Sequence, residues 1–313
     1  MAEVVALVGC KGPAQETEYL QILSAALPGE RLVPFRAMNE AERAQAQVAI
    51  VANPDPAEVA ALPGLVWVQS LWAGVEKLVG AFDRPLPIVR LVDREMARAM
   101  AEAVLAWTTY LQRDMPAYAR QQRERVWKPH PYRKPADTVV GLLGLGALGT
   151  AAAERLTGAG FSVTGWSRTP KTIAGIETVH GADGLAPMLG HCDILVCLVP
   201  LTSETRGLVN AERLAALKPG AALINFARGP IVVTADLIAA LDAGHLSHAV
   251  LDVFDVEPLP AGSPLWTHPG VTVLPHISGP TDMDSAAATV AANLREYRST
   301  GQPPQGVDAG RGY

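Results

Sequence analysis

The stretch Val139-Val-Gly-Leu-Leu-Gly-Leu-Gly-Ala-Leu-Gly149 decides the fold of this chain. It sets Gly144, Gly146 and Gly149 in the pattern G-x-G-x-x-G, after an apolar run typical of a buried strand and before an Ala-rich segment typical of a helix. In such a turn the first glycine permits the bend, the second lets the backbone approach a pyrophosphate, and the third allows close helix–strand packing. The alternative is a glycine-rich turn that binds nothing, because the chain has 28 glycines. The flanking strand and helix favour a dinucleotide site.

Strands and helices are predicted to alternate along the whole chain outward from this stretch. Helical patterns separate the predicted strands, which is typical of βαβ units and parallel sheets. A longer helical stretch at about Glu95–Trp127 is interrupted by Pro116, and Thr281–Thr300 predicts a last helix. The predicted strands are Val4–Val8, Val48–Ala52, Leu65–Gln69, Ile88–Leu91, Val139–Leu143, Phe161–Trp166, Asp193–Val199, Ala221–Phe226, His248–Val253 and Val271–Leu274.

The length and composition indicate a globular chain with two domains. Its 313 residues suit two domains at roughly 150 residues each. We expect residues 1–99 with 282–313 to form one α/β domain, residues 100–281 to form the other, and a cleft between them to bind ligands. Apolar residues make up 49% and charged residues 18%, which excludes a disordered chain. A net charge of −5 gives no electrostatic reason to bind nucleic acid.

The cysteines and the N-terminus bear on location and on metals. Three cysteines are too few for a disulfide framework and point to a reducing compartment. The N-terminus lacks the positive charge of a signal peptide, and no apolar run reaches the ~20 residues of a membrane span. We therefore expect a cytoplasmic protein without membrane association. Because His191, Cys192 and Cys197 match no zinc spacing, no metal is expected.

The end of the second predicted strand of the dinucleotide domain indicates which dinucleotide binds. An NAD site needs an acid there, about 20 residues after the glycines, to bind the ribose 2′-hydroxyl. No Asp or Glu occurs between Glu154 and Glu177. The strand instead ends in hydroxyl and basic side chains that suit a 2′-phosphate, and the alternative is an ordinary solvated loop. We expect NADP(H), held by Ser167, Arg168, Thr169 and Lys171.

Three polar residues follow late strands of the same domain and suit carboxylate binding and proton transfer to a carbonyl oxygen. Arg228, Glu257 and His276 lie where ligands of open α/β sheets bind, beyond the carboxyl ends of the strands. An Arg fork suits a carboxylate, and a His suits proton transfer near neutral pH. A carboxylate beside that His favours its protonated form. Each residue alone has a structural alternative: a surface Arg, a Glu-Pro turn, a structural His. Together they predict a catalytic set.

Taken together, these motifs identify a family. Essentially the whole chain resembles the D-isomer-specific 2-hydroxyacid dehydrogenases. Within them it is most similar to the glyoxylate/hydroxypyruvate reductases of the A type, through Trp166-Ser-Arg-Thr169 and Ser263-Pro-Leu-Trp-Thr-His-Pro269. The segments that carry the family resemblance are Gly144–Gly149, Cys197–Thr205, Asn225–Gly229, Leu251–Pro258 and Pro275–Ser278.

The resemblance implies two Rossmann-like or flavodoxin-like parallel-sheet domains, with substrate bound by the first and NAD(P) by the second. It implies that the backbone N–H groups of Trp72, Ala73 and Gly74 hold the substrate carboxylate together with Arg228, and that Asp252 binds the nicotinamide carboxamide. It also implies a homodimer. The remaining residues expected along the cofactor are Ala147, Leu148, Leu198, Val199, Pro200, Thr205, Phe226, Ala227, Ser278 and Gly279.

The expected reaction is reduction of glyoxylate or hydroxypyruvate by NADPH to a D-2-hydroxy acid. His276 would act as general acid, Arg228 would hold the carboxylate, and Glu257 would pair with His276. Trp72 is bulky for its position, and Ser278-Gly279-Pro280 replaces a more Ala-rich sequence. Both departures leave the exact substrate open, and a bulkier 2-oxo acid, such as phenylpyruvate or a sugar-derived keto acid, is an alternative. A second alternative is a non-catalytic protein that senses dinucleotides.

Overall fold

The computed structural model describes residues 3–308 and 310, which form two compact units. One unit holds the residues up to Glu95 together with those from Thr281 onward, and the other is Met96–Pro280. The predicted divisions lay at residues 99/100 and 281/282, so the observed ones fall a few residues earlier. The first division falls near the start of helix α4 (Arg94–Gln112), because the buried face of this helix packs in the core of the second unit.

The described residues of the first unit form a five-stranded sheet in the order β2-β1-β3-β4-β5. Every paired strand is parallel. The strands are β1 (Glu3–Val8), β2 (Glu30–Pro34), β3 (Val48–Val51), β4 (Trp67–Ser70) and β5 (Ile88–Val89). The helices are α1 (Pro13–Ala26), η1 (Phe35–Ala37), α2 (Glu40–Gln45), α3 (Pro56–Ala60) and α10 (Met283–Thr300).

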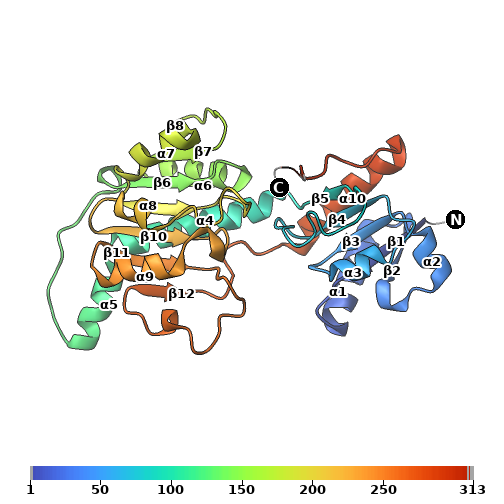
Figure 1. Ribbon diagram of the computed structural model, residues 1–313, viewed down its shortest axis with the longest axis horizontal. Helices are drawn as coiled ribbons and strands as arrows, with labels where there is room; N and C mark the ends of the chain where they lie inside the picture. The colour runs from blue at the N-terminus through green and yellow to red at the C-terminus, as the bar shows by residue number, and fades with distance from the viewer. Residues whose placement is uncertain (1–2, 309, 311–313) are drawn as a thin grey trace. The chain divides into compact units, whose positions relative to one another are not determined.

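Helix α10 belongs to the first unit although it follows the whole second unit in the sequence. It packs with α1 over one face of the sheet, where Val290 and Leu294 join the buried core (Figure 1). The ring of Tyr297 meets Trp67 of β4 edge to face, with ring centroids 5.7 Å apart. Arg298 donates two hydrogen bonds to the carboxylate of Glu30, each 2.9 Å long. Apolar burial and a bidentate ion pair thus hold α10 in the first unit.

The described residues of the second unit form a seven-stranded sheet in the order β12-β11-β10-β9-β6-β7-β8, with parallel pairing throughout. The strands are β6 (Val139–Leu143), β7 (Ser162–Ser167), β8 (Glu177–His180), β9 (Ile194–Cys197), β10 (Ala221–Asn225), β11 (Leu246–Leu251) and β12 (Val271–Val273). The helices are α4, α5 (Met115–Glu124), η2 (Pro135–Asp137), α6 (Ala147–Gly158), α7 (Gly181–Leu189), α8 (Ala211–Ala215), η3 (Gly229–Ile231), α9 (Thr234–Asp242) and η4 (Pro264–Trp266).

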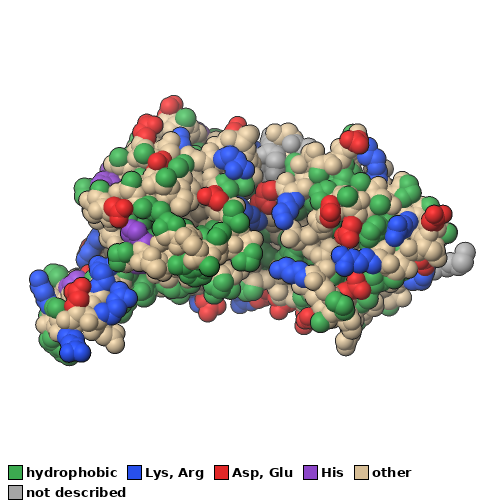
Figure 2. All heavy atoms as spheres, turned by 60° about the horizontal axis from the view of Figure 1, so that its bottom comes forward, with side chains coloured by type: hydrophobic (Ala, Val, Ile, Leu, Met, Phe, Trp, Pro, Cys, Tyr) green, Lys and Arg blue, Asp and Glu red, His purple; other side chains and the backbone are tan. Residues whose placement is uncertain are grey.

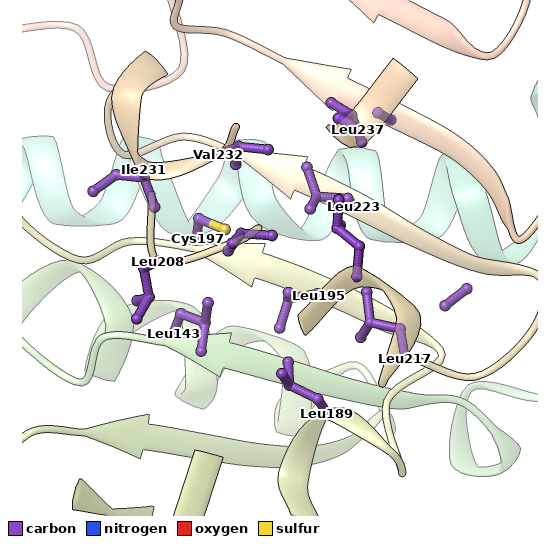
Figure 3. Close-up of a cluster of buried hydrophobic side chains, with 14 of the residues drawn as sticks. Leu143, Leu189, Leu195, Cys197, Leu208, Leu217, Leu223, Ile231, Val232 and Leu237 are labelled. Atoms are coloured by element: carbon purple, nitrogen blue, oxygen red, sulfur yellow. The ribbon is translucent and has the colours of Figure 1, made fainter. Parts of the chain in front are cut away.

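Helices cover both faces of this sheet, so its central strands are buried on both sides. Helices α7, α8 and α9 close one face, where Leu189, Leu195 and Leu223 meet in one cluster (Figure 3). Helices α4 and α6 close the other face through residues such as Val104 and Leu156. Double burial explains why these strands are continuous apolar runs without alternation.

The strand order reverses between β6 and β9, which are neighbours at the centre of the sheet. From β6 the chain proceeds to β7 and β8 on one side, and from β9 to β12 on the other. In open α/β sheets, ligands bind outside the carboxyl ends of the strands at the point where the strand order reverses. The glycine-rich stretch follows β6, so it lies at this switch point.

Two strands were not predicted, and both are edge strands. β2 and β8 carry charged and polar residues, as in Glu30–Pro34 and Glu177–His180. A strand at the edge of a sheet is partly exposed to solvent and needs no continuous apolar run. A search for apolar runs therefore does not detect such a strand. The long predicted helix is two helices, because α4 ends at Gln112, Asp114 adopts a left-handed conformation, and Pro116 lies in the first turn of α5.

Helix α5 and the segment after it project from the rest of the second unit (Figure 1). No helix among the described residues is long and apolar enough to span a membrane.

Candidate active site

The loop after β10 carries Arg228, and a buried Asn shapes that loop. The side-chain oxygen of Asn225 accepts a hydrogen bond from Ala227 N at 3.1 Å, and its amide nitrogen donates to Arg228 O at 3.0 Å. Because Asn225 is buried, both bonds are shielded from water. The half-buried Arg228 side chain itself donates to Ala227 O at 2.7 Å. The backbone that carries this guanidinium is therefore held from within the sheet.

Gly229 brings the Arg228 loop against the loop after β11. A Cβ at this position would lie 2.0 Å from the carbonyl carbon of Phe254, closer than real Cβ atoms approach any atom. Only a glycine permits this contact between the two backbones. The next residues of the second loop include Glu257, so the contact sets Arg228 and Glu257 on neighbouring loops.

Glu257 and His276 form the predicted pair. Nδ1 of His276 lies 2.7 Å from Oε2 of Glu257, while Oε1 accepts a hydrogen bond from Phe254 N at 2.9 Å. An ionised carboxylate only accepts, so the ring donates from Nδ1 and its Nε2 is left for other chemistry. Both side chains are partly exposed, at 49% for His276 and 35% for Glu257. The pair is thus oriented and still reachable by a small ligand.

Asp252 positions the segment that carries His276. Its two carboxylate oxygens accept from Ile277 N at 2.7 Å and from Ser278 N at 2.9 Å. Asp252 is almost fully buried, and His276 has a positive φ of 54°, a conformation that non-glycine residues rarely adopt. The two hydrogen bonds that the carboxylate accepts hold the backbone directly after this unusual conformation. The predicted contact of Asp252 with a nicotinamide carboxamide stays a prediction.

Ser278 and Gly279 differ in what they contact. The hydroxyl of Ser278 is buried and has no hydrogen-bond partner among the described residues. Since buried polar groups are normally hydrogen-bonded, this hydroxyl is suited to bind a ligand. A Cβ on Gly279 would lie 2.8 Å from the terminal methyl of Met100, so this glycine serves packing against α4. Ser278 therefore fits the predicted cofactor role better than Gly279 does.

The glycine-rich loop has the geometry that a pyrophosphate needs. Gly144 has a φ of +106°, and a Cβ there would lie 2.9 Å from the backbone of Leu198 and Val199. A Cβ on Gly149 would lie 1.8 Å from Gly144 O, so this glycine allows α6 to pack on the turn. A Cβ on Gly146 would meet no atom within 4 Å. The loop is therefore tight on two sides and open at the glycine where a phosphate would approach.

Helix α6 begins directly at that open glycine. Gly146 is its N-cap, and no side chain caps the helix. Ala147 and Leu148 thus begin a helix whose positive end points at the open space. Free N–H groups at a helix N-terminus bind anions well. The residues present fit a dinucleotide at the switch point.

The loop after β7 carries the predicted phosphate-binding residues. Ser167 is buried and its hydroxyl donates to Thr169 O at 2.8 Å. The ammonium of Lys171 donates to Leu145 O in the glycine-rich loop at 2.6 Å. Arg168 pairs with Glu204 at 3.1 Å. The Lys171 hydrogen bond thus joins this loop to the glycine-rich loop. Arg168 and Lys171 are the two cations that the loop carries. The hydroxyl of Ser167 already donates its proton within the turn.

The remaining predicted cofactor residues follow β9 and β10. Leu198 N donates to Leu143 O at 2.8 Å, which keeps this segment beside the end of β6. Thr205 closes the turn, because its hydroxyl donates to Pro200 O at 2.6 Å. Phe226 and Ala227 are buried at the end of β10. Leu198, Val199, Pro200, Thr205, Phe226 and Ala227 therefore lie around the carboxyl ends of the strands, and their contacts with a cofactor stay predictions.

The predicted carboxylate loop follows β4 in the first unit. Trp72 N donates to Ser70 Oγ at 2.9 Å, and Trp72 O accepts from Leu91 N at 3.0 Å. The indole packs against the α1–α10 core, and its Nε1 is buried with no partner among the described residues. Ala73 and Gly74 continue the loop and are half-buried. The loop that carries the three predicted N–H groups is thus held at Trp72 on both sides.

Asn225, Gly229 and Glu204 lie in segments that carry the family resemblance, but the sequence analysis assigned them no role of their own. Asn225 and Gly229 lie close to Arg228 in the sequence, so a polar residue at the end of a strand and the adjacent glycine were available signals. No sequence signal pairs Glu204 with Arg168, which lies 36 residues away. Among the described residues, no three His, Cys, Asp or Glu side chains group to hold a metal ion.

Known proteins match this arrangement over the full chain. The NAD-binding domain of the D-isomer specific 2-hydroxyacid dehydrogenases matches residues 105–278. The glyoxylate/hydroxypyruvate reductase A of Serratia proteamaculans is 38% identical over 298 residues, 93% of this chain and 94% of its own. A D-isomer specific 2-hydroxyacid dehydrogenase from Xanthobacter autotrophicus, solved with NADPH and MES, is 41% identical, with a TM-score of 0.94 over 100% of both chains.

A further solved structure is similar over its full length. It is an NADPH-dependent glyoxylate/hydroxypyruvate reductase from Sinorhizobium meliloti, in complex with NADP and sulfate. It is 33% identical, with a TM-score of 0.90 over 100% of both chains. The match covers both parallel-sheet units and the segments around Arg228, Glu257 and His276. The chain belongs to the family of D-isomer specific 2-hydroxyacid dehydrogenases.

Proposed function

We propose that this protein reduces glyoxylate and hydroxypyruvate to D-2-hydroxy acids with NADPH. The observation that carries the proposal is the hydrogen bond of 2.7 Å between His276 and Glu257, beside the loop that holds Arg228. Relatives with 34–38% identity over most of the chain are glyoxylate/hydroxypyruvate reductases of the A type, which supports the choice of substrates. The chain is accordingly an enzyme, a dehydrogenase that uses NADP(H).

The residues present suit NADP(H) at the switch point. The open glycine and the uncapped start of α6 would take the pyrophosphate. Arg168 and Lys171 would take the 2′-phosphate, and β7 ends without the acid that an NAD ribose needs. When bound, the reduced nicotinamide supplies the hydride that the reaction requires.

The chain's own residues supply binding and the proton. Arg228 holds the carboxylate of the 2-oxo acid and stabilises negative charge on the reacting oxygen. Glu257 holds the imidazole ring through Nδ1, so that Nε2 carries the proton that the developing alkoxide takes. The N–H groups of Ala73 and Gly74 are proposed to bind the same carboxylate, whereas the N–H of Trp72 already donates to Ser70 Oγ.

The experiment that tests the proposal follows the loss of reduced-nicotinamide absorbance. It crosses NADPH and NADH with glyoxylate, hydroxypyruvate, pyruvate and phenylpyruvate. We expect turnover with NADPH to be fastest on the first two acids. Activity on phenylpyruvate alone would replace the substrate assignment, and Trp72 would then shape a different pocket. Binding of NADP⁺ without turnover on any acid would favour the alternative of a dinucleotide sensor.

We also propose a homodimer formed through the projecting α5 region. Trp127 is 99% exposed, and Met115, Val126 and Tyr132 of the same region are also exposed. Apolar side chains exposed in one region of a surface are typical of interaction sites. The same region is rich in Lys and Arg (Figure 2), as in Arg123, Arg125 and Lys128. We expect Trp127→Ser to lower the mass in light scattering from dimer to monomer, while Trp266→Ser, at an exposed Trp elsewhere in the unit, leaves it unchanged.

A cytoplasmic location is proposed on the three cysteines, which are all free thiols in the structure.

A further inference from the structure

Arg168 and Glu204 form an ion pair between the loops that follow β7 and β9. Arg168 follows β7 and Glu204 follows β9, and these strands flank β6 on opposite sides. The pair joins Nη1 of Arg168 to Oε2 of Glu204 at 3.1 Å. Because the glycine-rich loop follows β6, the pair links the two loops on either side of it. A dinucleotide at the switch point would lie beside both side chains.

Arg168 and Glu204 each lie in a turn that is held by side-chain hydrogen bonds. On one side Ser167 is buried and bonds Thr169 O, which holds the backbone at Arg168. On the other side the Thr202 and Thr205 hydroxyls each accept a hydrogen bond from the other residue's N–H, at 3.2 and 2.8 Å. Glu204 lies inside this closed turn. The two charged side chains are therefore brought together by the backbone on both sides.

The charge of Glu204 opposes the role assigned to Arg168. A 2′-phosphate carries up to two negative charges, and its strongest partner in a protein is an Arg fork. A carboxylate already on that guanidinium must be displaced, and it repels the phosphate at short range. A ribose 2′-hydroxyl carries no charge, so the Glu204 carboxylate does not repel it and does not lower the affinity for NADH. Glu204 thus acts against NADPH and leaves NADH unaffected.

We propose that Glu204 is a specificity-determining residue that competes with the 2′-phosphate of NADPH for Arg168. It reduces the preference for NADPH over NADH below the value that Arg168 and Lys171 alone would give. The proposal rests on the NADP(H) cofactor proposed above. It links the cofactor preference to an ion pair between two different loops.

The test measures binding directly with the full-length protein. Calorimetric titrations with NADP⁺, NAD⁺, 2′,5′-ADP and 5′-ADP, at one fixed salt concentration, give dissociation constants independent of turnover. Partly exposed ion pairs have modest strength, so Glu204→Gln should tighten NADP⁺ and 2′,5′-ADP by roughly threefold to fivefold. NAD⁺ and 5′-ADP should stay within about twofold. Glu212→Gln, which removes the same charge from the exposed start of α8, should change none of them.

A second variant tests whether the effect passes through Arg168. Arg168→Ala should weaken NADP⁺ binding by about tenfold or more, since it removes a charge-assisted hydrogen bond. In that background Glu204→Gln should no longer improve binding by more than about twofold. Weaker NADP⁺ binding in Glu204→Gln would overturn the proposal, because Glu204 would then orient Arg168. Equal tightening of NADP⁺ and NAD⁺ binding would overturn the proposal too. A wild-type protein that binds neither NADP⁺ nor 2′,5′-ADP would overturn the assignment of NADP(H) as the cofactor as well.

Discussion

Glu257 accepts two hydrogen bonds at once, and one of them comes from His276. Oε2 lies 2.7 Å from His276 Nδ1, and Oε1 lies 2.9 Å from Phe254 N. The carboxylate is therefore fixed to its own loop by one oxygen and orients the imidazole with the other. A ring held through Nδ1 presents Nε2 in a defined direction, which proton transfer to a substrate oxygen requires.

Replacing the imidazole should remove the proton donor. His276→Ala is expected to lower kcat for glyoxylate reduction by about 100- to 10,000-fold, the usual contribution of general acid catalysis, with little change in NADP⁺ affinity. Steady-state kinetics and a binding titration measure the two quantities. His268→Ala is the matched control, because His268 forms a similar pair with Asp242 at 3.2 Å outside the site. Near-normal turnover of the His276 variant would refute its assignment as the acid.

Replacing the carboxylate by an amide should disturb the ring. In Glu257→Gln only one side-chain oxygen remains to accept, so either the bond from Phe254 N or the bond from His276 is lost. We expect kcat to fall on the order of 10- to 1,000-fold, as is usual when a carboxylate that orients a catalytic His is removed. Asp242→Asn, at the His268 pair, serves as the control. A variant with unchanged kcat would mean that His276 needs no orienting partner.

Replacing the Arg228 guanidinium by an ammonium of the same charge should weaken binding of the substrate more than binding of the cofactor. Arg228→Lys loses the planar fork that suits a carboxylate, so KM for the 2-oxo acid should rise by about 10- to 100-fold. KM for NADPH should stay nearly constant. Arg213→Lys, whose side chain bonds Leu208 O in the same unit, should leave both constants near wild type. An equal rise in the two KM values would place Arg228 with the cofactor.

A methyl group at the open glycine should block the cofactor without unfolding the protein. In Gly146→Ala the new Cβ meets no protein atom within 4 Å, so stability should fall by at most about 1 kcal/mol, the cost of a poorer helix cap. The same Cβ would lie where the pyrophosphate approaches, and NADP⁺ affinity should drop by about tenfold or more. Gly158→Ala, at the other end of α6 with equally open space, is the control. Unchanged NADP⁺ binding in Gly146→Ala would remove the pyrophosphate from this loop.

The buried His248 predicts a loss of stability in mild acid. Burial, followed by the positive charges of Arg120 and His268, lowers the pKa of His248 from 6.5 to about 4. Below about pH 6.5 the unfolded chain binds a proton that the folded protein does not, so stability falls until about pH 4. The total loss from this one group is about 3 kcal/mol.

Urea unfolding at several pH values checks this expectation. His248→Gln keeps a polar partner for Thr272 Oγ1, which lies 2.9 Å from His248 Nε2, and should flatten the fall of the unfolding free energy between pH 6.5 and 4. His191→Gln, at an exposed His after α7, should leave the slope as in wild type. Identical slopes for all three proteins would show that His248 is protonated in the folded state.

The sequence alone determined the family and the two parallel-sheet domains, and it predicted which residues form the site. These features depend on short-range physics: apolar runs bury themselves as strands, and glycines at Gly144, Gly146 and Gly149 permit one particular turn. The absence of an acid after β7 and the order of Arg228, Glu257 and His276 are likewise visible along the chain. Edge strands β2 and β8 were missed, since a strand exposed at one edge needs no apolar pattern.

Only the tertiary structure decided which of these residues meet and how they are held. The contact of Gly229 with Phe254, the hydrogen bonds of Asp252 with Ile277 N and Ser278 N, and the Arg168–Glu204 pair each join residues that are 25 or more positions apart. Such contacts depend on the order of the strands, which reverses between β6 and β9, and no local pattern encodes that order. Local periodicity therefore specifies elements and chemistry, whereas the packing of loops at one edge of the sheet determines the geometry in which that chemistry operates.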